Sequence, residues 1–377
     1  MTGLGAQSLA NGTAGMALLH IERAHVGTES WYSAHTWIKQ ATSGEITSAD
    51  HAGLYYGAPA VSFLLHAAQA DGSERYRRPI KTIDSYVTRL AERRLIQATA
   101  RADHGDPATF HEYDLFYGLT GIAALLLRHP PDADILPAIL RHLIRLTHPT
   151  SDGLPGWWVA HDPDRIKPTP GGHANLGMAH GAAGLLALLS IATRQGVAVD
   201  GQFEAIDRLC VWFDQWRQDG RTGPWWPQWI TLPELADGRL RQPGPPRPSW
   251  CYGTPGIARA LQLAGLALDD TSRQQQAEHA LAACLTDPAQ LRHLTGPGLC
   301  HGVAGVYQTA WRAARDARTR SISERLPFLA GLLDRHAVTT KNDGSLLNGA
   351  AGLALASHTS AHQTPPHSGW DSCLLIT

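Results

Sequence analysis

The strongest pattern along this 377-residue chain is a short glycine step followed by a run of apolar residues, and it occurs seven times. Each step has the form Gly-x-x-Gly, except in the second copy, where Ala60 stands in place of the second glycine. The apolar residues that follow cover nearly every face of a helix, which predicts buried helices rather than surface helices. The copies span residues 11–19, 56–65, 117–127, 180–189, 252–261, 301–310 and 348–356.

The segments between the copies have ordinary amphipathic spacing and polar faces, which predicts outer helices. Examples are residues 79–97, 133–148, 202–218 and 321–337. The leading glycines are 45 to 72 residues apart, so each unit has room for two helices, and a period in this range is typical of repeat architecture. We therefore expect an all-α fold: an α/α toroid of seven inner and about seven outer helices, in a single domain over residues 1–377.

Composition narrows the function classes. The net charge is −1 and there is no basic run, so a nucleic-acid partner is not expected. No segment has the ~20 apolar residues that a membrane span needs, and the N-terminus lacks the features of a signal peptide. Five cysteines, an odd number, do not suggest a disulfide framework. We expect a reducing cytoplasm, in which cysteines are available for metal binding.

Two long segments, residues 149–179 and 219–249, are rich in proline and tryptophan. Loops of this length in a compact domain are usually functional or disordered. Trp225, Trp226 and Trp229 favour a packed loop that faces a substrate. The alternative is that these tryptophans only seal the ends of helices.

Three copies carry side chains that can bind a metal just before the glycine step: AHGAAG at 179–184, WCYGTPG at 250–256 and LCHGVAG at 299–305. Cys251 and Cys300 are 49 residues apart, far outside zinc-finger spacing, so only repeat geometry can bring them together with His301. Thiolate and imidazole ligands favour zinc. Three protein ligands leave one position for a substrate, as in catalytic zinc sites. The alternative is that both cysteines are ordinary buried thiols.

The segments SWCYGTPG and LCHGVAG, placed on a sevenfold glycine step, resemble the lanthionine synthetase C-like family of lantibiotic cyclases. The stretches GHANLGMAHGAAG, YDLFYGLTG and WDSCLLIT are also similar to bacterial members. The resemblance covers essentially the whole chain. It implies an α/α toroid with a Zn²⁺ ion at the mouth of the inner barrel.

The resemblance also implies roles for individual residues. Cys251, Cys300 and His301 match the family's zinc ligands, and His180 and Asp114 match its proposed acid/base residues. Three further residues match positions near the metal, and they are Arg247, Trp250 and Tyr252.

Zinc at such a site would deprotonate a substrate thiol, and the thiolate is the reactive nucleophile. Conjugate addition to dehydroalanine or dehydrobutyrine, followed by protonation of the enolate, gives lanthionine or methyllanthionine. The expected enzyme is thus a lanthionine synthetase that forms C–S bonds in a dehydrated precursor peptide. A separate dehydratase would act first, and a peptide exporter is a further potential partner that would place the cyclase at the periphery of the membrane.

His180 suits acid/base work because an imidazole titrates near neutral pH; its alternative role is to cap a helix start. Asp114 could orient His180 or take the thiol proton, and the alternative is a helix N-cap. Arg247 could stabilise the enolate oxygen or form a surface ion pair, while Tyr252 and Trp250 are expected to shape the substrate pocket. The remaining cysteines are expected to be packing residues, and they are Cys210, Cys284 and Cys373.

Three other functions remain open from the residues. The site could add glutathione or another small thiol to a dehydroamino acid, or the toroid could bind a peptide around a structural zinc. A glycosidase would need two carboxylates across the mouth, but the positions before the glycine steps offer cysteine and histidine. In one respect the chain departs from the family, since little sequence precedes the first copy at residue 12. We expect either a ring with one outer helix missing, a C-terminal segment that fills the gap, or a start site placed late.

Overall fold

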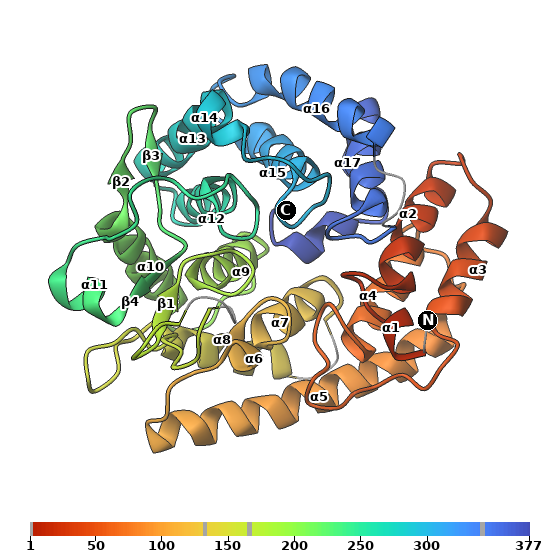
Figure 1. The fold of residues 1–377 in the computed structure, drawn as a ribbon. Coiled ribbons are helices and arrows are strands. Elements are labelled where there is room, and N and C mark those ends of the chain that lie inside the picture. The colour runs from red at the N-terminus through yellow and green to blue at the C-terminus, as the bar shows by residue number, and fades with distance from the viewer. Residues whose placement is uncertain (1–2, 131–133, 164–167, 340–343) are drawn as a thin grey trace.

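The computed structural model describes residues 3–130, 134–163, 168–339 and 344–377. Helices form two concentric layers that close into a ring (Figure 1). The predicted α/α toroid is therefore confirmed. No helix in the described ranges has both the length and the apolar character needed to cross a bilayer.

The inner layer consists of the seven helices that follow the glycine steps. Each begins directly after its leading glycine, without a capping side chain. These helices are buried on most sides, as the sequence pattern predicts. In α9, for example, every residue from Ala182 to Ala192 is buried. The inner helices are α2 (Thr13–His25), α4 (Ala58–Ala68), α7 (Leu119–Arg128), α9 (Ala182–Arg194), α12 (Thr254–Ala267), α15 (Val303–Asp316) and α17 (Ala350–His362).

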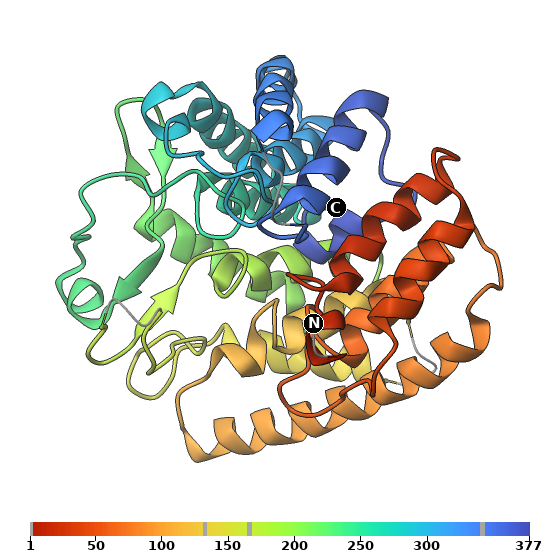
Figure 2. The same ribbon diagram turned by 45° about the vertical axis from the view of Figure 1, so that its right-hand side comes forward.

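The outer layer has six long helices among the described elements, one fewer than the roughly seven expected. They bury one face only; α3, for example, buries Ala34, Ile38 and Ala41. The longest, α5, runs along the outside of the ring (Figure 2). The outer helices are α3 (Trp31–Ala41), α5 (Arg77–His104), α8 (Ile135–Leu146), α10 (Gln202–Trp216), α13 (Thr271–Thr286) and α16 (Leu326–Thr339).

Short elements occupy the connections. Strand β1 (His173–Asn175) pairs antiparallel with β4 (Trp229–Thr231), and β2 (Gln218–Asp219) pairs antiparallel with β3 (Pro224–Trp225). The short helices are α1 (Gly3–Ala6), α6 (Phe110–Tyr113), α11 (Leu232–Asp237) and α14 (Pro288–Leu291), with 3₁₀ turns at Ser323–Arg325 and Trp370–Leu374.

The tryptophans of the two long connections are mostly buried. Trp157, Trp158, Trp225 and Trp226 are each 6% exposed or less, and the Trp226 indole donates to the backbone oxygen of Phe213 in α10 at 2.8 Å. These four side chains therefore seal the protein interior, as the alternative interpretation held. Trp229 is only partly buried, and its ring lies 6.2 Å from that of His173.

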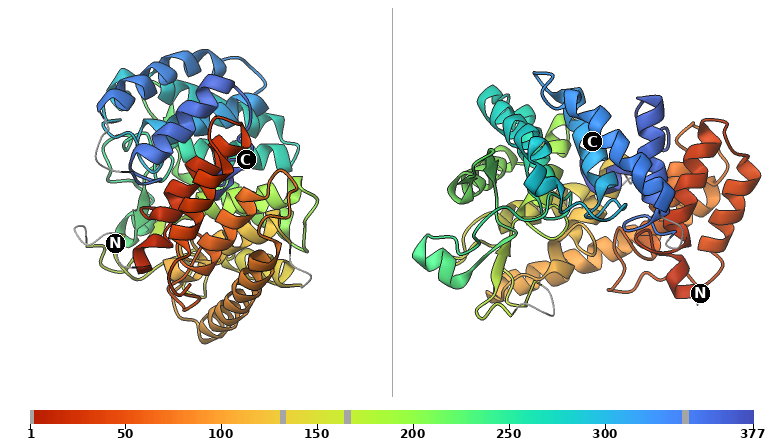
Figure 3. Two further views of the ribbon diagram at one scale, coloured as in Figure 1. Left: turned by 90° about the vertical axis from the view of Figure 1, so that its right-hand side faces the viewer. Right: turned by 45° about the horizontal axis from the view of Figure 1, so that its top comes forward.

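A closed circuit of backbone hydrogen bonds joins the loops that precede the seven inner helices. In each loop, residues two or three positions before the leading glycine bond to the equivalent residues of the next copy. The last copy bonds to the first, and α17 packs beside α2 (Figure 3). The seven bonds, N–H to O, are Leu9–Tyr55 3.0 Å, Tyr55–Phe116 3.5 Å, Leu115–Ala179 3.2 Å, Ala179–Cys251 3.3 Å, Cys251–Cys300 3.2 Å, Cys300–Leu347 2.9 Å and Leu347–Ala10 3.0 Å.

The second glycine of each Gly-x-x-Gly step packs closely against a backbone carbonyl group of the loop that precedes its helix. In six copies, a Cβ atom at this position would come closer to that oxygen than real contacts allow. The second copy differs because Gly57 has a φ of 74°, whereas the other six leading glycines have negative φ. The different entry into α4 accompanies the alanine at position 60.

The C-terminal tail fills the centre of the ring (Figure 1), and Trp370 to Ile376 are buried. Side chains from several copies donate hydrogen bonds to backbone carbonyl groups of the tail. These bonds run from Tyr55 Oη to Cys373 at 2.8 Å, from Trp250 Nε1 to Leu374 at 2.8 Å and from Arg259 Nε to Ile376 at 3.0 Å. The segment does not supply an outer helix. It forms a central plug instead.

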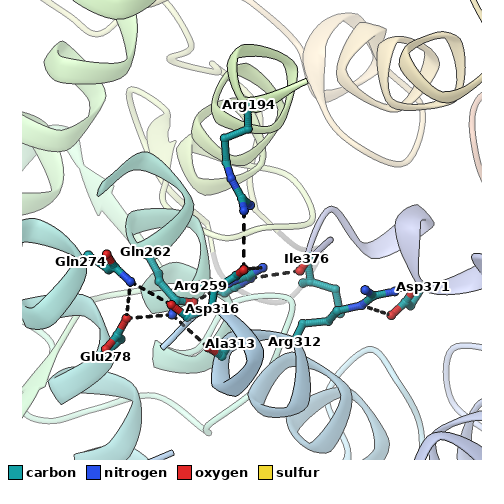
Figure 4. A network of polar contacts seen from close by, with 10 residues as sticks. All are labelled: Arg194, Arg259, Gln262, Gln274, Glu278, Arg312, Ala313, Asp316, Asp371 and Ile376. Atoms are coloured by element: carbon teal, nitrogen blue, oxygen red, sulfur yellow. Dashed lines mark hydrogen bonds and ion pairs between the residues drawn. The ribbon is translucent and has the colours of Figure 1, made fainter. Parts of the chain in front are cut away.

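Charged groups hold this plug in place (Figure 4). Asp371 is fully buried and accepts two bonds from the Arg312 guanidinium, at 2.6 and 2.7 Å, and one from Gln308 at 2.7 Å. Beside it, Arg259 pairs with Asp316 at 2.7 Å, and Arg194 approaches the same carboxylate at 3.5 Å. Inner helices α9, α12 and α15 are thus tied to one another and to the tail.

Replacing Gly352 with alanine tests the close approach beneath the carbonyl. The new Cβ would overlap the Leu346 oxygen and crowd the Leu299 side chain, so we expect the free energy of unfolding to fall by about 1–3 kcal/mol. Urea denaturation measures it. Gly331→Ala is the matched control, because this helical glycine has open space around it and alanine favours helix. Equal effects of the two substitutions would contradict the explanation.

Replacing Asp371 with alanine tests the plug. Arg312 would lose its carboxylate in a largely buried position, and breaking a buried pair in this way costs about 3–5 kcal/mol. Thermal or urea unfolding should show the loss. Asp219→Ala, which removes the exposed pair with Arg217, should cause no measurable change. A similar stability for both variants would argue against the tail as a structural plug.

Candidate metal and catalytic site

Two cysteines and a histidine converge where α12 and α15 begin. Cys251 and Cys300 each lie two residues before a leading glycine, and the backbone bond between them belongs to the circuit of loop contacts. One ligand atom from each of Cys251, Cys300 and His301 lies within 4.8 Å of the other two. The structure therefore brings together the residues that the repeat pattern predicted would meet.

The two thiols influence each other strongly. A hydrogen bond from Cys300 holds the pKa of the Cys251 thiol well below its ordinary value. The same contact, together with burial, raises the pKa of Cys300 far above its usual range. A divalent cation would favour both thiolates.

The donor set fits zinc. Two sulfurs and an imidazole nitrogen are ligands that zinc prefers over the oxygen ligands of calcium and magnesium. Within the described ranges, no other group of three His, Cys, Asp or Glu side chains meets the same spacing. The five cysteines form no disulfide. Burial raises the pKa of both Cys210 and Cys373 to about 12, which agrees with their expected packing roles.

His180 and Asp114 form a second pair beside this group. Loop bonds place them there, because Leu115 donates to the Ala179 oxygen and Ala179 donates to the Cys251 oxygen. The His180 Nδ1 atom lies 2.5 Å from Asp114 Oδ2. Asp114 Oδ1 accepts from the backbone N–H groups of Tyr117 at 2.6 Å and Gly118 at 2.9 Å. Asp114 therefore contacts His180 and also holds the loop that leads into α7, but it does not cap that helix, whose N-cap is Gly118.

Aromatic rings surround the His180 imidazole. Phe110 stacks on it at 5.1 Å between ring centroids, Phe116 lies at 4.9 Å and Tyr252 at 6.0 Å. The Tyr113 hydroxyl donates to the His180 carbonyl at 3.1 Å. The ring is thus fixed by packing while its side chain stays 20% exposed. Sequence analysis missed these phenylalanines, although Phe116 holds the same position in its copy as Cys251 and Cys300.

The remaining predicted residues lie at different depths. Arg247 is exposed on the loop before α12, and its positive charge only slightly opposes the rise in the pKa of Cys300 that Cys251 and burial cause. Tyr252 is partly buried next to His180, and burial raises its pKa. Trp250 is fully buried and bonded to the C-terminal tail. Trp250 therefore packs in the interior next to Cys251, whereas it was expected to line a substrate pocket.

Two histidines near these loops have structural partners. His111 stacks on Tyr117 at 4.6 Å. His173 is fully buried in β1, where its Nδ1 atom lies 3.1 Å from the His161 carbonyl. Burial lowers the pKa of His173 to about 4, so this side chain stays neutral at physiological pH.

Known proteins resemble the chain over most of its length. The family described as lanthionine synthetase C-like protein matches residues 5–375. The nisin biosynthesis protein NisC from Lactococcus lactis subsp. lactis is 24% identical over 278 residues, which make up 72% of this chain but only 63% of that relative. Among solved structures, nisin cyclase has the same fold with a TM-score of 0.83 at 21% identity, over 99% of this chain and 93% of that one. Because the family match extends over nearly the whole chain, the protein belongs to the lanthionine synthetase C-like family.

Proposed function

We propose that this protein is a zinc-dependent cyclase that forms thioether rings in a dehydrated precursor peptide. The observation that carries the proposal is the convergence of Cys251, Cys300 and His301 next to the His180–Asp114 pair. The likeness to proteins named nisin cyclase and nisin biosynthesis protein supports it.

Zinc would be held by the two thiolates and the His301 imidazole, and when bound it lowers the pKa of a substrate thiol. We assign both proton transfers, from the substrate thiol and to the enolate, to His180. Asp114 accepts the Nδ1–H group, which leaves Nε2 to take the thiol proton as a base and to return it as an acid. We further propose that the exposed guanidinium of Arg247 stabilises the negative charge on the enolate oxygen.

The overall reaction balances without a redox partner. The substrate S–H bond breaks, and a bond forms between sulfur and the β-carbon of dehydroalanine or dehydrobutyrine. The π electrons move to the carbonyl group, and the α-carbon of the enolate receives a proton. The product has the same mass as the dehydrated peptide, with one thiol fewer.

We also propose the partners and setting that such a reaction requires. The substrate is a peptide already dehydrated by a separate enzyme, and the product passes to an exporter. A dehydratase, an exporter and a cytoplasmic location are therefore parts of the same proposal. Neighbouring genes that encode a dehydratase and a transporter would support it.

Metal content tests the ligand assignment. We expect about one zinc per chain in the purified protein and a loss of most of it in Cys300→Ala, because two ligands cannot hold the ion as three do. Elemental analysis of the purified proteins measures this. Cys284→Ala is the matched control, since Cys284 is a buried thiol in α13. Unchanged zinc in Cys300→Ala would refute the site.

The rate of cyclisation tests His180. With a dehydrated peptide that contains a cysteine, we expect loss of free thiol at constant mass, and His180→Ala should slow it by about 10²-fold or more. Zinc content should stay unchanged. The control is His104→Ala, an exposed histidine at the end of α5. Equal rates for wild type and His180→Ala would contradict the acid/base role.

A more conservative substitution, Asp114→Asn, separates orientation from folding. An amide oxygen can still accept from Tyr117 and Gly118, but its NH₂ group would face His180 Nδ1 and favour the wrong tautomer. We expect normal stability and zinc content with a cyclisation rate that falls toward that of His180→Ala. A normal rate would show that the pair only packs the loop.

A further inference from the structure

A serine is buried beside one of the candidate metal ligands. Ser249 is 2% exposed and stands two residues before Cys251, in the loop that leads into α12. The Cys251 thiol donates a hydrogen bond to the Ser249 hydroxyl, with 3.6 Å between Sγ and Oγ. Ser249 is not one of the three candidate ligands, yet it contacts one of them directly.

The same serine also shapes the turn before the helix. Its Oγ atom accepts from the backbone N–H group of Tyr252 at 3.3 Å, and its backbone oxygen accepts from Gly253 at 3.1 Å. A hydroxyl group has two acceptor positions but only one hydrogen to donate. The Tyr252 N–H group uses an acceptor position, so the hydroxyl hydrogen stays available. Among the described residues, Cys251 is the only side chain that is bonded to this hydroxyl.

The first copy of the repeat contains the same turn without the cysteine. Ser8 holds the position equivalent to Ser249, and its Oγ atom accepts from the Asn11 N–H group, also at 3.3 Å. Two residues after Ser8, however, the chain carries Ala10. The turn bond therefore serves the loop in both copies, whereas the contact with a sulfur atom is an additional feature of Ser249.

The other candidate sulfur ligand has no such neighbour in its own loop. The residue two positions before Cys300 is Gly298, and a Cβ atom there would collide with the Leu347 backbone oxygen. No side chain can therefore occupy this position next to Cys300. A hydroxyl group from the same loop reaches only one of the two thiols, and that thiol is Cys251.

Metal binding would reverse the direction of this hydrogen bond. A cysteine binds a metal as the thiolate, which has lost its hydrogen and can only accept. The Ser249 hydroxyl keeps its own hydrogen and would then be the donor. A hydrogen bond to a charged sulfur is stronger than one from a neutral thiol, so the contact favours the metal-bound state.

We propose that the Ser249 hydroxyl donates a hydrogen bond to the Cys251 sulfur when a metal is bound, and that Ser249 is a positioning residue for this ligand. The proposal rests on the metal site of the proposed function. The bond holds the sulfur in the orientation that the metal needs. It also withdraws electron density from the sulfur, which leaves the metal a stronger acid toward a substrate thiol.

Cobalt tests this bond because Co²⁺ can take the place of zinc and, unlike zinc, absorbs light. The full-length protein is freed of metal with a chelator and titrated with Co²⁺ alone. Thiolate ligands then give a charge-transfer band in the near ultraviolet, and its energy depends on the electron density of the sulfur. In Ser249→Ala we expect the band to move to longer wavelength, since a sulfur without the hydrogen bond gives up an electron more easily.

Zinc affinity provides a second measurement. We expect Ser249→Ala to bind Zn²⁺ about tenfold more weakly, or worse, because hydrogen-bond partners of metal ligands contribute to affinity at this level. Competition with a chromophoric chelator measures the Kd. Ser249→Thr keeps the hydroxyl group, so its band and its zinc affinity should stay close to those of the wild type.

Ser8→Ala is the matched control, because it removes the same turn bond from a loop without a cysteine. Its band and zinc affinity should equal those of the wild type. An unshifted band in Ser249→Ala would overturn the proposal, as would equal effects of Ser249→Ala and Ser8→Ala, or a band in Ser249→Thr that moves as far as in Ser249→Ala. A wild type without any thiolate band would overturn the metal site itself, and with it both proposals.

Discussion

The site depends on the circuit of backbone hydrogen bonds that joins the seven loops at one end of the ring. A residue two positions before a leading glycine uses its backbone to bond its neighbours, so this contact does not depend on which side chain the residue carries. The bond from the Cys251 N–H to the Cys300 oxygen then brings two thiols together across 49 residues of sequence. Neither cysteine could reach the other through local structure. In six of the seven copies the tight glycine step allows this arrangement, because a Cβ atom at the second glycine would collide with a backbone oxygen of the loop.

The C-terminal tail stabilises this circuit of loops from the centre of the ring. A ring of inner helices leaves polar and aromatic side chains facing its centre, and these need partners in a region without bulk water. The last residues of the chain supply backbone oxygens to Tyr55, Trp250 and Arg259. Two of these groups touch the site, since Trp250 precedes Cys251 and Tyr55 stacks on Phe116 at 4.2 Å. The position of the candidate metal ligands thus depends on a segment that is not part of the Cys251, Cys300 and His301 group.

Sequence alone predicted the parts of this structure that repeat. Glycine spacing and all-round apolar runs located the inner helices, and equivalence among copies predicted that Cys251, Cys300 and His301 would meet. It could not place segments that occur once. The tail gave no sign of its central position, and the number of outer helices was overestimated by one among the described elements. Arg94 sits in a polar amphipathic stretch and reads as a surface residue, because its burial arises only when the loop around Asp50 and Ala52 folds over it.

The polar chemistry is confined to one arc of the ring, and electrostatics explains why. Asp114, His180, Cys251 and the Cys300–His301 pair come from four consecutive copies, whereas the two residues before the leading glycine in the other three copies are Ala10–Asn11, Tyr55–Tyr56 and Leu347–Asn348, which carry no thiol, imidazole or carboxylate. Cys251 is buried and Cys300 is half-buried, and two neighbouring thiolates repel each other unless a cation compensates their charges. A metal at this point would compensate the sulfurs in one half of the arc, and in the other half the Asp114 carboxylate lies 2.5 Å from His180 Nδ1. A charged group in such a partly buried place is costly unless an opposite charge lies close to it.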